Sequence, residues 1–414
     1  MNIKKICFII CVFLSGTIIY AGGYRISVQG NKQLAMGHTG VAVISSAENI
    51  FFNPASMSFL NGELNVSLGV SGVFSNVAFQ NQDLGISTAT DNSIRTPVYA
   101  YGTYKINNWL SAGLAVYTPY GSSVTWPTDW AGSHLVNNIE LQSIFIQPTV
   151  SVKLSDHLSI GGGPIYAIGS VNFNRNLSRT LSNTEGARTN VTIDDKGITA
   201  WGYNVGLLFR ASGKLNVGIS YRSEIIVEAE NGDADFENVP SALPGDFSDT
   251  TFDASLPLPA ELTVGLSYQI NNKVLVAFDF NRAYWNVYKS LDVQFDNSAG
   301  LSRNPRNYKN ASTYRFGLQY TANQRFVLRG GFYFDESPIQ DGFYAPETPR
   351  NDSVGFTGGF TININPRLAV DTSFLYLRFA EVTNSYDFFD DGSSFGGTYK
   401  SNAFIPGIGL SYKL

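Results

Sequence analysis

From residue 63 onward, apolar residues alternate with small or polar residues along most of the chain. In 262–270, Leu, Val, Leu, Tyr and Ile occupy every second position, and Thr, Gly, Ser and Gln fill the positions between them. The same alternation recurs in 201–209 and 356–364. A period of two predicts β-strands with one apolar face and one small or polar face. Both a soluble β-sandwich and a membrane-spanning barrel contain such strands.

Strand length and connection length favour the barrel. The alternating segments are roughly 10 to 20 residues long, whereas the usual strand has about 5 to 6 residues. About 9 to 11 residues suffice to cross the hydrocarbon core of a bilayer. We predict 14 antiparallel strands, at residues 63–79, 97–106, 109–119, 138–154, 157–174, 197–211, 214–230, 257–270, 273–295, 309–321, 325–336, 353–364, 367–384 and 399–414.

Short turns and long loops alternate between these strands, which places both chain termini at the short-turn end of an all-β transmembrane barrel. In the bacterial outer membrane that end faces the periplasm. The last strand can pair with the first and leave no open edge. Aromatic residues near the turns are expected to form an interfacial girdle; they are Tyr104, Trp109, Tyr268, Tyr320, Phe326 and Tyr412.

Residues 22–62 lack this alternation. They are Gly-rich, have no period of 2 or 3.6, and end in an apolar turn at Asn53, Pro54 and Ala55. A barrel of this circumference would otherwise have an open lumen. We therefore predict an N-terminal hatch at 22–62 inside a barrel formed by 63–414.

Residues 1–21 have the pattern of a secretory signal peptide. Lys4 and Lys5 precede an apolar stretch at 6–19, and Ala21 offers a small residue for cleavage. After this segment no run of 18 apolar residues occurs, so no transmembrane helix is predicted. The chain is expected to be exported to the outer membrane.

Both cysteines of the sequence, Cys7 and Cys11, lie in this leader. The mature chain is therefore expected to contain no disulfide, thiol nucleophile or cysteine metal site. Without Lys4 and Lys5 the chain keeps 26 basic and 33 acidic residues, a net charge of −7. Nothing in this balance suggests nucleic acid as a partner.

The sequence offers little for catalysis. Its three histidines, His38, His134 and His157, are predicted far apart, so a shared metal site is not expected. His134 could serve a lipase-like Ser/His centre, but no orienting partner stands at a recognisable spacing. The acidic pairs 194–195 and 390–391 are expected in long loops as solvated charge, or bridged by calcium. We predict no enzyme, no catalytic residue, no resident metal and no cofactor.

Two predicted extracellular loops contain apolar residues where water is expected. Trp126 and Trp130 lie in the second long loop, and Phe236, Leu243 and Phe247 lie in the fourth. Either the loops fold over one another and bury these side chains, or they form an apolar groove that captures hydrophobic ligands. A general hydrophilic porin would gain nothing from such a groove.

A series of motifs in a fixed order leads to a family. The chain resembles the FadL-type outer-membrane transporters of long-chain fatty acids and other hydrophobic compounds, over essentially the whole mature sequence. The resemblance rests on the Asn53-Pro54-Ala55 turn, TPYG at 118–121, DWAG at 129–132, SYRSEI at 220–225, LPLPAEL at 256–262 followed by Trp285, and LRGGFYFDESPI at 328–339 followed by Pro349 and Asp352.

The resemblance implies a monomeric 14-stranded barrel in which ligand passes from the loops to an internal apolar pocket. It further implies a lateral exit into the bilayer beside a kink in the third strand, where Gly121 matches the kink glycine. Pro119 lacks an N–H and Gly121 lacks a side chain, so both are poor members of a strand ladder. A plain strand end at this point is the other interpretation.

The resemblance also implies a basic residue that meets the ligand carboxylate in the pocket. Lys309 matches one such position, and Arg175 lies two residues from a second. Either side chain could instead be solvated loop charge. Asn53, Pro54 and Ala55 would lie on the element that moves when ligand arrives.

The function expected from these observations is passive uptake of long-chain fatty acids or other hydrophobic molecules. Outer-membrane lipids and the barrel assembly machinery are the other expected partners. Leu414 stands where the family usually ends in an aromatic residue. A surface adhesin or structural barrel is the alternative, and it would affect attachment but not hydrophobic uptake.

Overall fold

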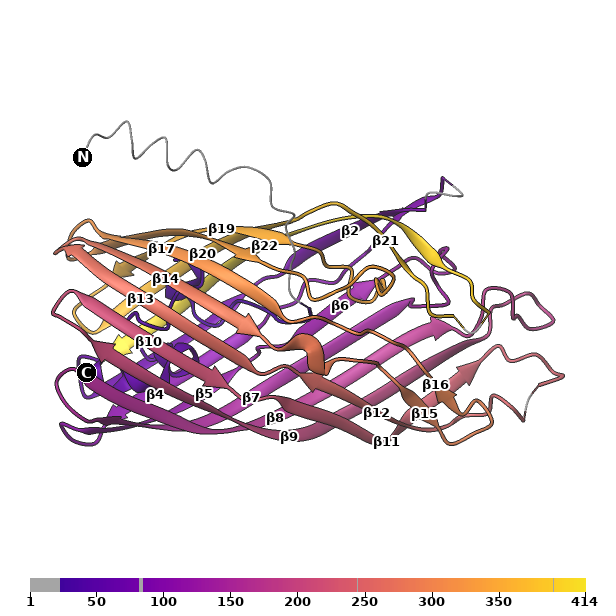
Figure 1. Cartoon of the computed structure of the whole chain (residues 1–414), viewed down its shortest axis with the longest axis horizontal. Coiled ribbons are helices and arrows are strands. Elements are labelled where there is room, and N and C mark those ends of the chain that lie inside the picture. The colour runs from indigo at the N-terminus through magenta and orange to yellow at the C-terminus, as the bar shows by residue number, and fades with distance from the viewer. Residues whose placement is uncertain (1–22, 82–84, 244, 390) are drawn as a thin grey trace.

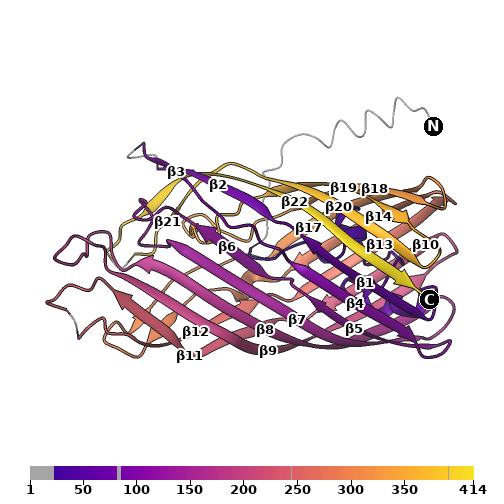
Figure 2. The ribbon, with the colours of Figure 1, turned by 180° about the vertical axis from the view of Figure 1, so that it is seen from behind.

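A closed antiparallel β-barrel forms most of the molecule (Figures 1 and 2). The computed structural model describes residues 23–81, 85–243, 245–389 and 391–414, so the predicted signal peptide lies outside it. The strands are β1 (Leu64–Ser71), β2 (Phe74–Gln80), β3 (Ser87–Ala89), β4 (Val98–Lys105), β5 (Leu110–Tyr117), β6 (Gly121–Thr125), β7 (Asn138–Lys153), β8 (Leu158–Asn176), β9 (Asn190–Arg210), β10 (Leu215–Arg222), β11 (Ile225–Glu237), β12 (Thr250–Leu258), β13 (Glu261–Asn271), β14 (Val274–Ala283), β15 (Val293–Phe295), β16 (Leu301–Ser302), β17 (Ala311–Thr321), β18 (Phe326–Asp335), β19 (Ser353–Asn363), β20 (Leu368–Phe379), β21 (Val382–Tyr386) and β22 (Phe395–Lys413).

These elements make up 14 spanning strands, which confirms the predicted fold. Several spanning strands are interrupted, so β1 continues as β2, β5 as β6, β10 as β11, and β20 as β21. Pairing of β1 with β22, from Asn65 opposite Lys413 to Ser71 opposite Gly407, closes the barrel. Every backbone group at this seam therefore finds a partner without an open edge.

The alternation seen in the sequence corresponds to the two faces of the wall. Along β17, Phe316, Leu318 and Tyr320 are exposed on the outer surface, while Arg315 on the other face is buried in the lumen. Apolar residues outside and polar residues inside are what a bilayer requires of a barrel. No helix in the described ranges is long and apolar enough to cross a membrane.

Several bounds of the predicted strands are wrong; for example, β11 runs to Glu237 and β12 begins at Thr250, where a long loop was predicted. The ninth strand was expected to run through 273–295, but β14 ends at Ala283 and a short 3₁₀ helix, η2 (Trp285–Val287), follows. The reason is that Trp285 turns inward, fully buried, and packs edge-on against Tyr24 at 4.8 Å between ring centroids. The sixth strand begins at Asn190, earlier than predicted, and so Asp194 lies on β9 rather than in a loop. The third spanning strand resumes after its break as β6.

Residues 23–62, the inner segment, pack within the barrel and contain α2 (Asn31–Leu34), α3 (Asn49–Phe52) and η1 (Pro54–Phe59). Figure 1 shows this segment in indigo among the strands. The Asn53 side chain accepts from the Ala55 N–H (3.1 Å) and donates to main-chain oxygens of Val41 (2.8 Å) and Leu207 (3.0 Å). A Cβ at Gly206 of the wall would overlap the Asn53 Oδ1. The Asn53-Pro54-Ala55 turn therefore anchors the inner segment to the wall.

Candidate functional site: two cavities that meet at a broken strand

The third spanning strand breaks at Thr118–Tyr120, between β5 and β6. β4 pairs with β5 as far as Tyr99 opposite Tyr117, whereas β6 pairs with β7 alone among the described strands. Here the inner segment supplies the missing partner: the Ile26 N–H donates to the Pro119 oxygen (2.9 Å), and the Gly121 N–H donates to the Tyr24 oxygen (3.1 Å). The break therefore joins the barrel wall to the inner segment.

The residue types at the break explain its local shape. Pro119 has no N–H to give to a neighbouring strand. A Cβ at Gly121 would lie 2.9 Å from Ile26 Cδ1 and 3.1 Å from the Leu141 oxygen, so a side chain there would press against the inner segment and the neighbouring strand. The predicted kink at Pro119 and Gly121 thus coincides with a break in the wall.

A cavity of about 420 Å³, the lateral cavity, lies at this break. Ile94, Val98 and Ile144 line it, and these side chains are also 57%, 51% and 45% exposed on the outer surface. The lateral cavity therefore reaches the apolar outer face of the wall. Its lining also includes Arg25 and Arg350, together with the buried apolar residues Leu375, Ala403 and Ile405.

A second cavity, the apolar cavity of about 130 Å³, lies inside the barrel between the break and the extracellular strand extensions. Tyr24 of the inner segment lines its lower end. Its walls are mainly Leu, Ile, Val and Phe side chains from β7, β8, β9, β11, β12 and β15: Ile139, Leu141, Val171, Phe173, Val191, Ile193, Val227, Phe252, Leu256, Val293 and Phe295. Both cavities share five lining residues, Tyr120, Gly121, Leu141, Gln142 and Ser143.

Two arginines line the apolar cavity. Arg175 donates to Ser302 Oγ (2.8 Å) and Asn304 Oδ1 (3.4 Å), both of which are uncharged. Arg306 instead forms an ion pair with Glu347, and both side chains are almost completely buried. Lys309 lines neither cavity; its main-chain N–H donates to the Pro338 oxygen (2.8 Å).

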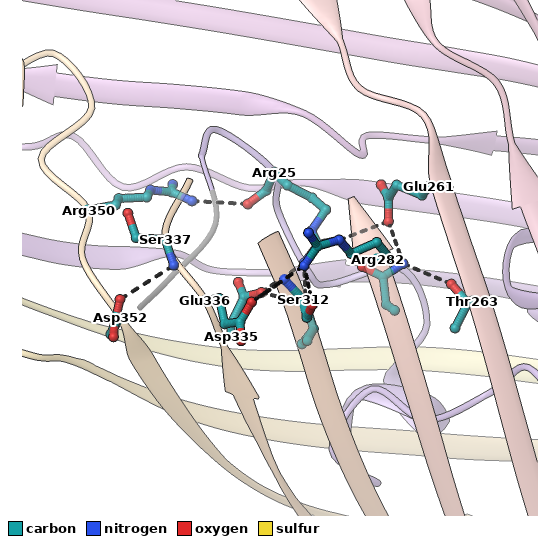
Figure 3. A network of polar contacts seen from close by, with 12 residues as sticks. Arg25, Glu261, Thr263, Arg282, Ser312, Asp335, Glu336, Ser337, Arg350 and Asp352 are labelled. Atoms are coloured by element: carbon teal, nitrogen blue, oxygen red, sulfur yellow. Dashed lines mark hydrogen bonds and ion pairs between the residues drawn. The ribbon is translucent and has the colours of Figure 1, made fainter. Parts of the chain in front are cut away.

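Arg25 fixes the inner segment to four strands of the wall (Figure 3). Its guanidinium donates to Glu261 on β13 (2.8 Å), Asn281 on β14 (2.6 Å), Thr313 on β17 (2.8 Å) and Asp335 on β18 (3.1 Å). Burial alone would lower the pKa of Arg25, but the two carboxylates outweigh burial and raise it above its usual value. Arg25 therefore stays charged at every physiological pH.

A second polar contact ties the inner segment to the wall at Glu48. The Tyr99 hydroxyl donates to the buried Glu48 carboxyl (3.1 Å), and Lys32 pairs with Asp371 (3.4 Å) nearby. Burial raises the pKa of Glu48 to about 7, even though Lys32 attracts its charged form. Glu48 is thus the acid of the inner segment that titrates near neutral pH.

Most of the apolar residues predicted in the loops are buried rather than arranged around an open groove, and Phe236 lies on β11 instead of in a loop. Trp126 and Trp130 stack at 4.2 Å between centroids and are 3% and 6% exposed. Phe236 packs against Phe247 in a separate cluster. This arrangement agrees with the interpretation that the loops fold over one another, while Leu243 and Phe247 remain partly exposed.

His134 packs in the same aromatic cluster as Trp130, Phe389 and Phe395, which we call the aromatic lid. It contacts the rings of Phe389 and Phe395, and the Arg179 Nε donates to its Nε2 (3.4 Å). Burial, followed by the positive charge of Arg179, lowers the pKa of His134 to about 4. Within the described ranges, no group of three or more His, Cys, Asp or Glu residues could hold a metal ion. Asp390 lies outside the described residues.

Sequence reasoning alone missed Arg25, Arg306 and Arg350. Arg25 lies in the inner segment, and its carboxylate partners stand more than 200 positions later in the chain. Arg306 stands three residues before Lys309 in RNYK at 306–309, and this proximity to a predicted carboxylate contact was the one sequence feature that could have pointed to it.

Comparisons with known proteins agree with this architecture. The family model described as outer membrane protein transport protein (OMPP1/FadL/TodX) matches residues 12–414. A putative outer membrane protein of Neisseria meningitidis, NMB0088, is 21% identical over 99% of this chain and 98% of its own length. The long-chain fatty acid transport protein of Escherichia coli K12 is 20% identical over 89% of this chain and 90% of its own.

Solved structures show the same fold. The crystal structure of a Pseudomonas aeruginosa FadL homologue matches with a TM-score of 0.83 and 17% identity, covering 94% of this chain and 99% of that one. The toluene transporter TodX of Pseudomonas putida matches with a TM-score of 0.72 and 16% identity, covering 92% and 97%.

Proposed function

Because the chain belongs to the OMPP1/FadL/TodX family of outer membrane transport proteins, we propose that it takes up long-chain fatty acids or related hydrophobic molecules passively. Outer-membrane location, transport and the absence of an enzymatic role are properties of this family, so these three predictions are confirmed. A surface adhesin or structural barrel is not favoured. Monomeric state and insertion by the barrel assembly machinery stay predictions.

The observation that carries the proposal is the meeting of the two cavities at the broken third strand. They share Gly121 and Tyr120, and the lateral cavity reaches the outer apolar surface at Ile94, Val98 and Ile144. A hydrophobic molecule in the apolar cavity would therefore have a short route into the bilayer. Such a route needs no energy source, because the bilayer itself is the more apolar destination.

The lining of the apolar cavity supports an acid with a hydrocarbon tail as ligand. Each buried CH₂ contributes about 0.8 kcal/mol, so the hydrocarbon tail supplies most of the binding free energy. We therefore expect weak discrimination between ligands of different chain length. Arg175 offers a guanidinium whose contacts are uncharged, and a carboxylate would bind it more strongly than these do. We assign the carboxylate contact first to Arg175, and the expected role of Lys309 stays a prediction.

The inner segment is the natural gate of this route. Tyr24 lines the apolar cavity, Ile26 lines the lateral cavity, and Arg25 lies between them. A ligand can shift this stretch only if it binds the displaced arrangement more tightly. The Asn53-Pro54-Ala55 turn was predicted to lie on the element that moves, but because this turn is anchored to the wall, we propose instead that Tyr24–Ile26 moves while the turn serves as the fixed end.

Initial capture would occur at the loops. Leu243 and Phe247 are partly exposed, whereas Trp126, Trp130 and Phe236 are buried. We propose that the partly exposed residues receive the ligand and that the buried rings form a lid that must part.

Binding of oleate and of methyl oleate to the purified protein tests the proposed ligand class. Arg175→Gln should weaken oleate binding about tenfold, since it removes one charge-assisted contact, and leave the ester unchanged. Lys309→Gln is the matched comparison, because that residue lines neither cavity. Loss of the acid preference in Lys309→Gln but not in Arg175→Gln would overturn the assignment. Failure of the protein to bind either ligand would contradict the proposed function.

A further inference from the structure

A third cavity, which we call the polar chamber, lies between the inner segment and the wall and has a volume of about 40 Å³. It shares Arg25, Ile26 and Ser27 with the lateral cavity. From the wall, β9, β10, β13 and β17 contribute polar side chains: Asn204, Ser220, Arg222, Glu261, Thr263 and Arg315. A cavity of this size has room for about three water-sized particles, so it suits a small polar occupant and not a hydrocarbon.

Arg315 lines this chamber without a polar partner. It is only 5% exposed, and it makes no hydrogen bond or ion pair with another residue in the described part of the chain. Asp279 stands directly opposite on β14, but its Oδ2 accepts the N–H groups of Gly40 (2.7 Å) and Val41 (3.1 Å). A guanidinium carries five N–H donors and keeps its charge in proteins. The donors of Arg315 are therefore available to an occupant of the chamber.

Two more side chains offer donors to the chamber. Arg222 donates to the Phe51 oxygen (3.1 Å) and packs over the Phe51 ring (4.3 Å to the centroid), and no ion pair between described residues includes it. Neither ring nitrogen of His38 has a hydrogen-bond partner among the described residues. Burial, followed by the positive charge of Arg315, holds the pKa of His38 well below its usual value, so the ring is neutral and keeps one N–H.

Positive charge is in excess around the polar chamber. Arg350 belongs to this group because it donates to the main-chain oxygen of Arg25 (3.0 Å), as Figure 3 shows. Four guanidiniums then stand against three carboxylates: Arg25, Arg222, Arg315 and Arg350 against Glu261, Asp279 and Asp335. Water in the chamber would satisfy hydrogen bonds, including that of Asn204 Oδ1, but would leave the fourth charge uncompensated. A buried charge without a counter-charge is costly.

We propose that the polar chamber is a binding site for one small monovalent anion of the size of chloride, held by Arg315 and Arg222 from the wall and by His38 from the inner segment. The anion would neutralise the group of seven charges and form charge-assisted hydrogen bonds. Because residues 25–27 form one side of the chamber, the anion binds only while they are in place, and by mass action it stabilises the closed arrangement of the inner segment. The site is independent of the hydrophobic ligand that the protein carries.

Crystals of the mature protein grown in sodium bromide test the site directly, because bromide resembles chloride in charge and size and scatters anomalously. The wild type should show an anomalous peak in the polar chamber, within hydrogen-bonding reach of the Arg315 guanidinium. Arg315→Met should lose the peak. Arg329→Met should keep it, since Arg329 donates to Gln319 (2.9 Å) and Thr361 (2.6 Å) and lines none of the three cavities. A chamber that contains only water in the wild-type bromide crystals would overturn the proposal.

Hydrogen exchange in solution tests the effect on the inner segment. The Ile26 amide, which donates to the Pro119 oxygen, should be about tenfold better protected in sodium chloride than in sodium gluconate of equal ionic strength, since gluconate is too large for the chamber. Arg315→Met should abolish this difference and Arg329→Met should retain it. Unchanged exchange at Leu68, which pairs with Leu410 across the barrel seam, shows that each variant has folded.

The outcomes separate binding from its effect. Equal protection of Ile26 in both salts, together with a bromide peak, would leave the site but overturn its role in holding residues 25–27. A chloride effect that persists in Arg315→Met would overturn the assignment to Arg315. Neither result bears on the binding of oleate, so the proposed function is tested separately.

Discussion

Replacement of Arg25 by methionine should release the stretch of the inner segment that covers the broken strand. Methionine keeps much of the apolar stem but removes the guanidinium, which contacts Glu261, Asn281, Thr313 and Asp335 at 2.6–3.1 Å. Removing one partner of a buried ion pair costs about 3–5 kcal/mol, because the other charge stays buried. The side chains of Arg25, Glu261 and Asp335 are only 8%, 12% and 13% exposed, so this range applies.

The free energy is lost locally, since Asn53, Pro54 and Ala55 still anchor the segment. A change of 1.4 kcal/mol alters an equilibrium about tenfold, so opening of Tyr24–Ile26 should become roughly 100-fold to 4,000-fold more frequent. Hydrogen exchange followed by mass spectrometry measures this opening at the amides of Ile26 and Gly121, which donate across the break. Both should lose protection by about that factor.

Lys32→Met is the matched control, because it removes another ion pair of the inner segment, with Asp371, away from the break. It should leave exchange at Ile26 and Gly121 unchanged. Equal protection of these amides in Arg25→Met and in the wild type would refute the idea that Arg25 holds this stretch in place.

Three further changes probe other parts of the structure. The pKa of Glu48 is raised from 4.5 to about 7, so its neutral form stabilises the fold at low pH. This contribution, up to about 3 kcal/mol, is lost as the pH rises from 4.5 through 7. Thermal unfolding of Glu48→Gln between pH 5 and 8.5 should lack this decline in stability. The pKa of His134 is lowered from 6.5 to about 4, so acidification to pH 5 should destabilise the aromatic lid by about 2 kcal/mol. Hydrogen exchange of the loop amides should become faster at pH 5 in the wild type than in His134→Leu, after correction for the intrinsic effect of pH. Gly206→Ala should overlap Asn53 and lower the free energy of unfolding by about 1–3 kcal/mol in denaturant titrations, whereas Gly213→Ala, where a Cβ meets open space, should not. A Gly206→Ala protein as stable as the wild type would contradict the anchor.

The alternation predicted strands with one face toward lipid and one toward the lumen, and the length of the strands together with the alternation of short turns and long loops predicted the barrel. The predicted strand bounds were wrong where a strand extends beyond the membrane or where the chain turns into the lumen. Asp194 and Lys196 interrupt the apolar pattern of β9 since that strand rises beyond the bilayer, where polar side chains face water. Trp285 falls in the inward-facing register of β14, after Asn281 and Ala283, and packs inside against Tyr24 beyond the end of the strand.

The candidate site was predictable only in part. The break at Pro119 and Gly121 is visible in sequence, because these residue types cannot complete a ladder. Arg25 and its partners are not, since Glu261 and Asp335 lie far away in the chain and only the closure of the barrel brings them together.

Uptake of radiolabelled oleate by cells that produce the Gly121→Arg protein tests the central claim most directly. Gly121 lines both cavities and approaches Ile26 and Leu141 closely, so an arginine there would fill the point where the cavities meet. Gly213→Arg is the control, because a side chain at that periplasmic turn meets open space. The account predicts that Gly121→Arg reaches the cell surface in normal amounts and abolishes uptake, while Gly213→Arg transports normally. Normal uptake by surface-exposed Gly121→Arg protein would contradict the lateral route.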